Sequence, residues 1–366
     1  MNQNGFPSDL LKKPPADRIA YFNDYTMAHP ILADVIQKLM SCIQESADNS
    51  LIFIFGPTGV GKSTLLRRVS QKLIKASLSG LKSNKGRIPI AGIEAVAPEF
   101  SNFDWKDFYW RAFNALEDPF GDTRCLSPGH SKLKMRVALE SALRNRQPDI
   151  FYVDEAQNLG KVSSGRKLRD QADCIKSLAN LSSVQFVLVG TYELLMLRNL
   201  SAQLCRRSID IHFPRYQAEL PQDLKVFRSI VHTFQQNLPL ADESDLVEHW
   251  EFLYERSMGC VGILKNWLSR TLTNNLKEDK TCQKIQLKDL EKYAPPLEKC
   301  LVMVAEIREE ERQLDNKVNS SDLRAALGLK AISADQPEQT PTKKTRRAVG
   351  KPAPQRRPVG GGQGAK

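Results

Sequence analysis

The chain has 366 residues, of which 41% are hydrophobic, and its 53 Lys and Arg outnumber its 42 Asp and Glu to give a formal net charge of +11. This length suits a globular protein with one large core and a smaller second domain. No apolar run approaches the roughly 20 residues of a membrane-spanning helix, and the first 18 residues lack the layout of a secretory signal peptide. The seven cysteines form no C-x-x-C pair, so we expect reduced thiols in a cytoplasmic protein without a membrane partner.

The first predicted elements are a helix and the strand that follows it. Residues 1–18 form a polar lead-in, and apolar residues then recur at helical spacing between Ile19 and Glu45. Pro30 suits the first turn of a helix, where its missing N–H is not needed. We therefore expect a helix that begins at His29-Pro30 and leads into a buried strand over Leu51–Phe55.

The sequence after this strand, GPTGVGKS, has the pattern of a phosphate-binding loop, and a predicted helix over Ser63–Ala76 follows it. Its glycines let backbone N–H groups turn toward phosphate oxygens, its lysine reaches the β- and γ-phosphates, and its serine hydroxyl ligates Mg²⁺. The positive end of the helix faces the same anion. The pattern therefore predicts a site for ATP and Mg²⁺. Its residues are Gly56, Pro57, Thr58, Gly59, Val60, Gly61, Lys62, Ser63 and Thr64.

Four further strand-like runs alternate with helical stretches, which predicts an α/β fold with a three-layer parallel sheet. The aromatic residues between 105 and 110 have helical spacing, so we expect them in the core or at a subunit interface rather than on a surface that stacks bases. The runs are Ile88–Val96, Ile150–Val153, Val184–Val189 and Ile209–Phe213, and the helices are chiefly Trp105–Leu116, Lys132–Asn145 and Ala172–Leu181.

The strand that begins at Ile150 ends in two carboxylates, as a Walker B motif does, about ninety residues after the phosphate-binding loop. Asp154 would hold the hydrated Mg²⁺, and Glu155 would polarise the attacking water. Adjacent side chains on a strand point to opposite faces, but here the chain leaves the sheet and both can reach the site. The sequence therefore predicts ATP hydrolysis as well as ATP binding.

After Phe213 the sequence predicts only helices. From about Ser333 it is rich in Pro, Gly and basic residues with almost no apolar anchor, so we expect disorder there. The predicted domains are an N-terminal segment with a helix (1–45), an α/β core (46–215), a helical region (216–330) and a disordered basic tail (331–366). The helices cover Leu220–Leu238, Glu243–Met258, Val261–Leu276, Leu287–Tyr293, Glu298–Lys317 and Asp322–Leu327.

Two basic segments of the core are candidates for contact with nucleic-acid phosphates, which Lys and Arg bind without reading bases. The net positive charge favours such a partner, although residues 335–366, with eight Lys or Arg and two acids, supply +6 of the +11. Solvated basic loops are an equally good interpretation. The candidates are Arg124, Lys132, Lys134 and Arg136 before the Walker B strand, and Lys161, Arg166, Lys167 and Arg169 in a Ser/Gly-rich loop after it.

With its two nucleotide motifs and its helical region, the chain resembles the AAA+ ATPases. The resemblance implies an AAA+ P-loop core with a C-terminal helical lid. Thr191 falls where that family has its sensor 1 residue, and Lys265 stands where the family usually has the sensor 2 arginine. Arg206 and Arg207 fall where the family places the arginine that completes a neighbouring subunit's site, and the choice between them stays open. Such an arginine implies a ring or a helical filament.

Within that family, four strings in order resemble the TniB/TnsC group of transposition ATPases, relatives of the Mu phage ATPase MuB that include members from CRISPR-associated transposons. The strings are DEAQNL, IKSLAN, VLVGTYEL and GCVGILKNWL, in a match over about Tyr21 to Tyr293. The resemblance implies an ATP-dependent oligomer on double-stranded DNA that marks an insertion site, recruits the transposase and contacts a TniQ-type targeting protein. We expect ATP hydrolysis to disassemble it.

Other functions of the same nucleotide motifs stay open. The main alternative is a replication-type AAA+ initiator or helicase loader, which a winged-helix or helix-turn-helix end would favour; we find no clear one after Leu287. A membrane-associated secretion ATPase is disfavoured by the lack of an apolar span. A nucleotide-gated signalling module is disfavoured because we find no sensor repeats.

Overall fold

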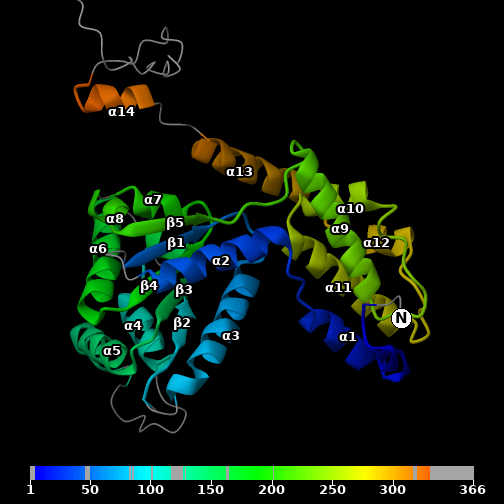
Figure 1. Ribbon diagram of the computed structural model, residues 1–366, viewed down its shortest axis with the longest axis horizontal. Coiled ribbons are helices and arrows are strands. Elements are labelled where there is room, and N and C mark those ends of the chain that lie inside the picture. Colours follow the sequence, from blue (N-terminus) through cyan, green and yellow to red (C-terminus); the bar gives the residue numbers. More distant parts are fainter. Residues whose placement is uncertain are drawn as a thin grey trace, which may run out of the picture. The chain divides into compact units, whose positions relative to one another are not determined.

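The structure is a computed structural model that describes residues 5–45, 50–81, 84, 86–99, 102–116, 127, 129–161, 165–200, 202–315 and 320–329. It divides into two compact units, Met1–Glu311 and Arg312–Lys366. The first unit contains a sheet of five parallel strands in the order β2-β3-β4-β1-β5 (Figure 1). The strands are β1 (Leu51–Phe55), β2 (Ile90–Glu94), β3 (Ile150–Asp154), β4 (Gln185–Gly190) and β5 (Ser208–His212). Each overlaps one predicted run.

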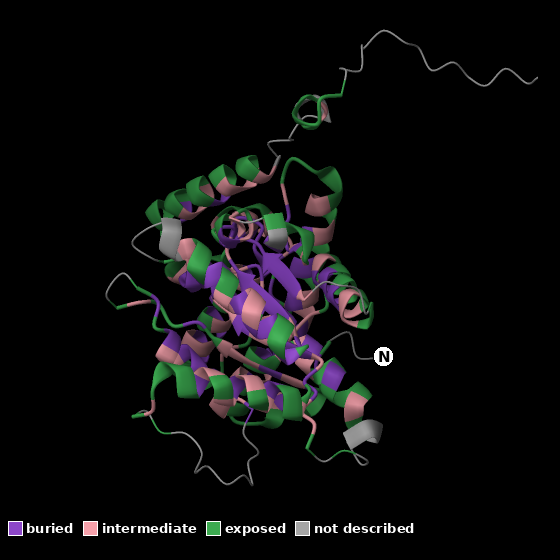
Figure 2. Ribbon diagram, turned by 90° about the vertical axis from the view of Figure 1, so that its left-hand side faces the viewer, coloured by how far each residue is buried: buried purple, intermediate pink, exposed green. Residues whose placement is uncertain are grey.

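Helices cover both faces of the sheet, so the strand residues alternate between two apolar layers. Ile52 and Ile54 pack with α2 (Pro30–Gln44) and α3 (Lys62–Leu81) on one face. On the other face the rings of Phe151 and Phe186 lie 5.2 Å apart between centroids. Figure 1 shows α4 (Trp105–Asn114), α5 (Lys132–Arg146) and α6 (Gly165–Ser182) across the strands from α3. Buried residues are concentrated in the strands (Figure 2), which confirms the predicted three-layer class.

A second apolar cluster lies among the helices that follow β5, and the N-terminal helix α1 (Pro15–Asp24) belongs to it. Phe22 of α1 is fully buried there, and the Arg18 Nε donates to the Pro239 carbonyl at 2.8 Å. Figure 1 shows α1 beside α11. Residues 25–29 then run from this cluster to α2 on the sheet. The later helices are α9 (Pro221–Asn237), α10 (Trp250–Ser257), α11 (Val261–Glu278) and α12 (Leu287–Tyr293).

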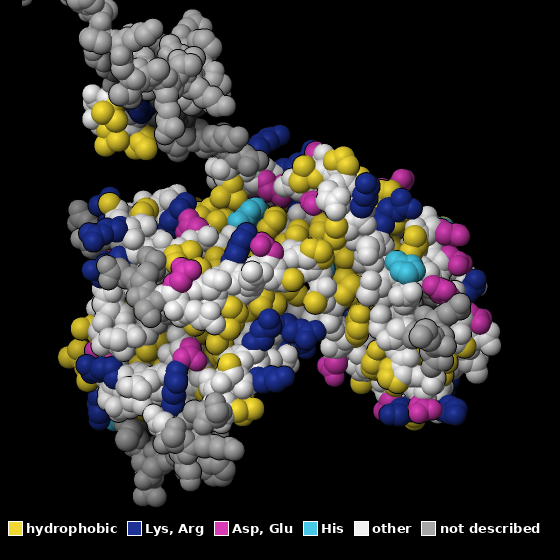
Figure 3. Space-filling view, viewed as in Figure 1, with side chains coloured by type: hydrophobic (Ala, Val, Ile, Leu, Met, Phe, Trp, Pro, Cys, Tyr) yellow, Lys and Arg dark blue, Asp and Glu magenta, His cyan; other side chains and the backbone are white. Residues whose placement is uncertain are grey.

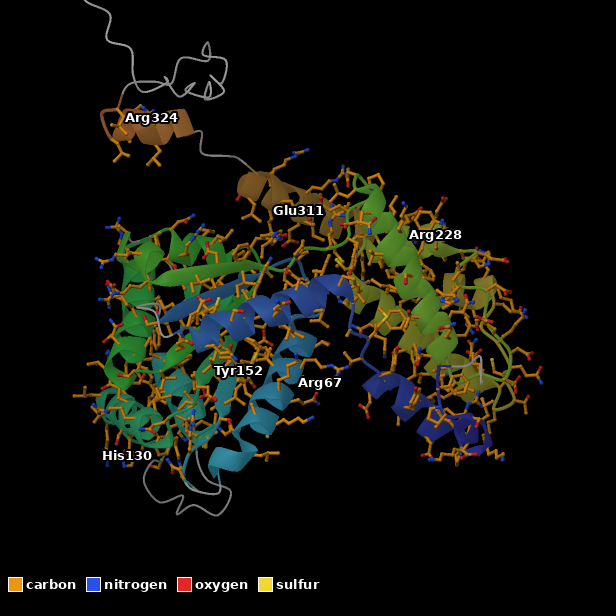
Figure 4. The ribbon with its side chains drawn as sticks, in the orientation of Figure 1. Arg67, His130, Tyr152, Arg228, Glu311 and Arg324 are labelled. Atoms are coloured by element: carbon orange, nitrogen blue, oxygen red, sulfur yellow. The ribbon has the colours of Figure 1, made fainter. Side chains whose placement is uncertain are left out.

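The helix α13 (Leu297–Asp315) belongs to the first unit as far as Glu311, and this part packs on the sheet region. Ile307, 4% exposed, joins the cluster formed by α2, α3 and the strands. Glu311 (Figure 4) accepts two hydrogen bonds from the Arg215 guanidinium, at 3.0 and 2.9 Å. Arg215 lies in the connection between β5 and α9, so this ion pair fastens α13 to the connection between the sheet and the helical region.

Several helices differ from the prediction where side-chain spacing carries little signal. The segment 161–169, expected as a loop, is helical from Gly165 onward, and the helix expected over 243–258 begins only at Trp250. Four short elements, too short to show a helical period, were not predicted. They are η1 (Ser8–Lys12), η2 (Ala156–Gly160), α7 (Leu194–Arg198) and α8 (Ala202–Arg206).

The second unit is described only in its N-terminal part, where α14 (Ser320–Ala326) ends before Gly328 at φ +70°. The predicted disordered tail lies outside the described residues, and the predicted domain boundaries stay predictions. Trp105, Phe108 and Tyr109 are buried, as expected for core residues. Among the described residues, no helix has the length and apolar content to cross a membrane.

Candidate functional site

The phosphate-binding loop joins β1 to α3 and is shaped by two glycines with left-handed backbones, Gly59 at φ +84° and Gly61 at φ +114°. L-residues rarely adopt such angles. The Lys62 ammonium is buried and donates to the carbonyls of Gly56 at 2.9 Å and Pro57 at 3.0 Å. Burial lowers the pKa of Lys62, while the carboxylates of Glu155 and Asp154 oppose the shift. The loop therefore presents a single cation among backbone groups, as phosphate binding requires.

The end of β3 places its carboxylates beside this loop. The Ser63 hydroxyl donates to Asp154 Oδ2 at 3.4 Å, and the Glu155 backbone N–H donates to Asp154 Oδ1 at 2.9 Å. Burial raises the pKa of Asp154, and the hydrogen bond from Glu155 works against that rise. A hydroxyl and a carboxylate facing each other form the hard oxygen pair that suits Mg²⁺. Ser63 and Asp154 therefore fit the predicted role of metal ligands.

Glu155 is the turning point between β3 and η2. Its backbone is left-handed, at φ 50°, so the chain leaves the sheet at once. The Gln157 Nε2 donates to Glu155 Oε2 at 2.6 Å. The Thr191 backbone N–H, at the end of β4, donates to Gln157 Oε1 at 3.3 Å. Thr191 Oγ1 is buried and has no hydrogen-bond partner among the described residues. Within that part of the chain, the predicted sensor residue therefore hydrogen-bonds to the Walker B region through its backbone N–H.

A pocket of about 630 Å³ opens at the phosphate-binding loop. Besides the loop and Glu155, it is lined by the connection between α1 and α2 and by the first half of α11. Of the residues on these two walls, only Lys265 was predicted from the sequence. The additional lining residues include Asn23, Tyr25, Thr26, Met27, His29, Arg67, Val261, Gly262, Asn266 and Ser269.

Cations hold the connection between α1 and α2 against the pocket. Arg67 projects from α3 toward the side of α1 (Figure 4) and donates to the Thr26 hydroxyl, and Arg68 donates to the Thr26 carbonyl at 2.7 Å. Lys265 donates to the Phe22 carbonyl and to Ser269 Oγ, and lies 4.3 Å from the centroid of the Phe22 ring. Burial, with Arg67 nearby, lowers the pKa of Lys265 to about 8. As placed, the lysine ties α1 to α11 and does not reach toward the phosphate loop.

His29 caps α2 at the inner wall of the pocket. Its Nδ1 accepts from the Leu32 N–H at 3.4 Å, so the Tyr216 hydroxyl, at 2.9 Å, donates to the same nitrogen. Burial lowers the pKa of His29 to about 4. The imidazole is therefore neutral at physiological pH.

The helix α11 closes directly on the phosphate-binding loop. The Ile263 N–H donates to the Gly59 carbonyl at 3.2 Å. A Cβ on Gly262 would lie 2.4 Å from that same oxygen, so only glycine allows the helix to approach this closely. The helical region thereby contributes one wall of the nucleotide site.

The predicted arginines Arg206 and Arg207 lie at the end of α8, and both side chains are exposed. Arg207 donates to Asn180 Oδ1 on α6 at 3.2 Å. Neither lines the pocket of its own chain. This position is compatible with action on a second copy, and the role stays a prediction.

The candidate DNA contacts fall into different settings. Lys132 and Lys134 are exposed in the first turn of α5, whereas the half-buried Arg136 donates to Glu140 at 2.9 Å and to Ser177 at 2.8 Å. Lys161 and Arg169 are exposed, with Arg169 on α6 instead of in the expected loop. Arg124 lies outside the described residues, as do the side chains of Arg166 and Lys167 on α6. In Figure 3, Lys and Arg side chains also gather over α3.

Comparisons with known proteins agree with this geometry. Residues 45–198 match the AAA domain family. The chain is similar to the ORC2 protein of Aeropyrum pernix in its ADPNP–ADP complexes, with a TM-score of 0.50 and 14% identity over 74% of this chain and 70% of that one. The A. pernix ORC1 protein in complex with DNA has a TM-score of 0.49 and 17% identity, covering 91% and 85%. The Walker-type ATPase paby2304 of Pyrococcus abyssi has a TM-score of 0.44 and 16% identity, covering 82% and 84%. No curated protein matches the sequence.

The AAA domain match and the likeness to ORC2 show that the fold is the AAA+ fold, with a parallel sheet and a helical C-terminal region. The predicted fold class is therefore confirmed. The chain is an ATPase, as its phosphate-binding loop and Walker B carboxylates predict.

Proposed function

We propose that this ATPase is an oligomeric regulator of DNA transposition that acts in the cytoplasm. It assembles on double-stranded DNA when it binds ATP, marks the insertion site, and links a TniQ-type targeting protein to the transposase. The observation that carries the proposal is the ordered set DEAQNL, IKSLAN, VLVGTYEL and GCVGILKNWL, which resembles the TniB/TnsC group. Three of these strings contribute to the nucleotide site, and the fourth contains Asn180, the partner of Arg207.

The residues of the pocket have distinct roles in this proposal. Lys62 neutralises phosphate charge, and Ser63 and Asp154 hold Mg²⁺, which supplies further charge neutralisation on the phosphates. Glu155 polarises the attacking water. The arginine that completes the site, Arg206 or Arg207, comes from a second copy, since neither lines its own pocket.

DNA contact in this proposal is electrostatic and independent of base sequence. The exposed cations Lys132, Lys134, Lys161 and Arg169 support it. The Arg136 guanidinium is already hydrogen-bonded to Glu140 and Ser177, so we assign this residue to positioning α5 against α6. Association should therefore weaken steeply as salt increases.

A replication-type initiator or helicase loader is the second candidate. The observation that favours it is the likeness of the fold to the ORC2 protein of A. pernix. Such a protein would act on a replicative helicase, whereas the first candidate acts on a transposase. The two functions are distinguished by adding a replicative helicase or a transposase to the DNA-bound protein and measuring which of them it recruits.

The first test images the protein with random-sequence duplex DNA by negative-stain electron microscopy, with and without a slowly hydrolysed ATP analogue, at low and physiological salt. We expect rings or helical filaments on DNA only with nucleotide. Lys62→Ala should abolish them, because it removes the buried phosphate cation, and Glu155→Gln should form them with ATP and retain them. The proposal would be contradicted if the protein failed to associate with DNA with or without the nucleotide. It would also be contradicted if Glu155→Gln assemblies were as short-lived as those of the wild type.

A further inference from the structure

Glu155, Gln157 and Thr191 form a chain of hydrogen bonds between two strands of the sheet. The Gln157 Nε2 donates to Glu155 at 2.6 Å, and its Oε1 accepts from the Thr191 N–H at 3.3 Å. Glu155 directly follows β3, and Thr191 directly follows β4, its neighbour in the sheet. The amide of Gln157 is therefore the link between the ends of these two strands.

A side-chain amide is the group suited to both bonds. An ionised carboxylate only accepts and a backbone N–H only donates, so the bridging side chain must donate on one side and accept on the other. The same requirement fixes which atom of the amide is the oxygen, since the reverse orientation would face two acceptors on one side and two donors on the other. Glutamate at position 157 would set a second carboxyl against Glu155 and add charge to the site, whereas methionine or leucine would lose both hydrogen bonds without adding charge.

The fold holds Gln157 in this position from several sides. The residue is 8% exposed and lies in η2, which Asn158 fastens to β2 by donating from Nδ2 to the Ala95 carbonyl at 2.8 Å. A Cβ on Gly190 would lie 2.4 Å from Gln157 Oε1, so the glycine at the end of β4 makes room for the amide. Glu155 has a left-handed backbone, which is unfavourable for a residue with a Cβ. In this conformation its carboxylate meets the Gln157 amide.

We propose that Gln157 is a positioning residue for ATP hydrolysis. Its amide holds the Glu155 carboxylate in the orientation that serves the attacking water and makes that orientation depend on the end of β4. The amide binds Oε2, which leaves Oε1 for the water. If a phosphate group or a second copy of the chain contacts Thr191 and displaces it, Gln157 transmits that displacement to the Glu155 carboxylate. The inference rests on the ATPase site and not on a role in transposition.

The test is single-turnover ATP hydrolysis by the full chain, together with equilibrium binding of a fluorescent ATP analogue. Gln157→Met keeps the approximate length and volume of the side chain, adds no charge, and removes both hydrogen bonds. We expect the rate of hydrolysis to fall about 10²-fold, the effect of a small misplacement of a catalytic group, in Gln157→Met and in Gln157→Leu, with nucleotide affinity unchanged.

Gln171→Leu is the matched control. Gln171 is also 8% exposed, and its Oε1 accepts from Trp105 Nε1, so the variant loses a buried glutamine hydrogen bond away from Glu155. It should retain the wild-type hydrolysis rate. Wild-type hydrolysis by Gln157→Met would overturn the proposal. Faster hydrolysis would also overturn it, because the amide would then restrain Glu155 from acting. A loss of nucleotide affinity equal to the loss of rate would show a merely structural role.

A double variant tests whether Gln157 acts through Glu155. In the Glu155→Gln background, Gln157→Leu should slow hydrolysis no further, because residues that act as a unit are not additive. An additive loss would assign Gln157 an effect independent of Glu155 and overturn the proposal. Duplex DNA does not enter these measurements, so the failure of the transposition proposal would leave their interpretation unchanged.

Discussion

His29 is a titratable side chain that the protein keeps neutral. Its pKa is lowered to about 4 by burial, from 6.5 in the unfolded chain. Between these pH values the unfolded state binds more protons than the folded state, so stability falls as the pH falls. The stability is fully present above pH 6.5 and is lost as the pH falls toward 4. A shift of this size corresponds to about 3 kcal/mol.

The substitution His29→Asn removes this titration and keeps a side chain that can cap α2. We expect the unfolding free energy of the wild type to fall by about 3 kcal/mol more than that of the variant between pH 6.5 and 4. Urea unfolding at a series of pH values measures the difference. His232→Asn, at an exposed histidine on α9, is the control and should follow the wild type. Identical pH profiles for wild type and His29→Asn would contradict the assignment.

The residues of the phosphate-binding loop and Walker B could be predicted because their chemistry is local in the sequence. Gln157 and Arg67 could not, since each acts through a partner that only the fold brings near: Thr191 for the first and Thr26 for the second. The glutamine lies in DEAQNL and could have been noticed as a buried polar residue beside two carboxylates. Nothing in the sequence near Thr26 indicates a nucleotide pocket.

Among the contacts that fasten α13 are an ion pair that is buried and one that is exposed. Arg215 and Glu311 have side chains 6% and 12% exposed, whereas Arg308 and Glu219 are each 58% exposed. Removal of one partner from a buried pair leaves an uncompensated charge and costs about 3–5 kcal/mol. An exposed pair contributes about 0–1 kcal/mol.

These magnitudes predict different outcomes for two substitutions at α13 contacts. Glu311→Ala should lower the free energy of unfolding by about 3 kcal/mol or more, because it strands the buried Arg215 guanidinium. Glu219→Ala should lower it by about 1 kcal/mol or less. Chemical denaturation of both variants measures the contrast, and equal losses would show that burial does not distinguish the two pairs.

The helices and strands were predicted best where the segment is long enough to show a period in its apolar residues. The five strands and the amphipathic α2, α9 and α11 were found from apolar spacing. The five-residue helices α7 and α8 span too few turns to show it, and the start of α6 at Gly165 is hidden by Ser163, Ser164 and Gly165, residues typical of loops. Tertiary packing, and not local preference, decides these segments.

At the scale of the whole first unit, the nucleotide pocket is assembled from distant parts of the chain. Most of its lining comes from the three segments 23–29, 58–64 and 261–269, and Glu155 and Phe234 are added from elsewhere. The first and last of these segments lie in the helical cluster, whereas the middle segment belongs to the sheet. A nucleotide in the pocket therefore stabilises elements from both clusters at once.

Hydrogen–deuterium exchange gives the corresponding prediction. ATP should slow amide exchange in all three segments together, and Lys62→Ala should remove the protection from all three, because all are coupled to one binding event. The control is α12, which contributes no residue to the pocket and should exchange alike with and without ATP. Protection confined to 58–64 would show that the outer walls do not engage the nucleotide.

The packing of α1 on α11 also affects how the protein emerges from the ribosome. Lys265 meets Phe22 across 243 positions of the chain, and Arg18 meets Pro239 across 221. At roughly 5–20 residues per second, α1 waits about 10–50 s for its partner to be translated. During that time Phe22 has no α11 to cover it, while β1 to β5 can already pair. The nascent chain thus completes its sheet well before it can enclose a nucleotide, and a chaperone that shields α1 would have its longest opportunity in this interval.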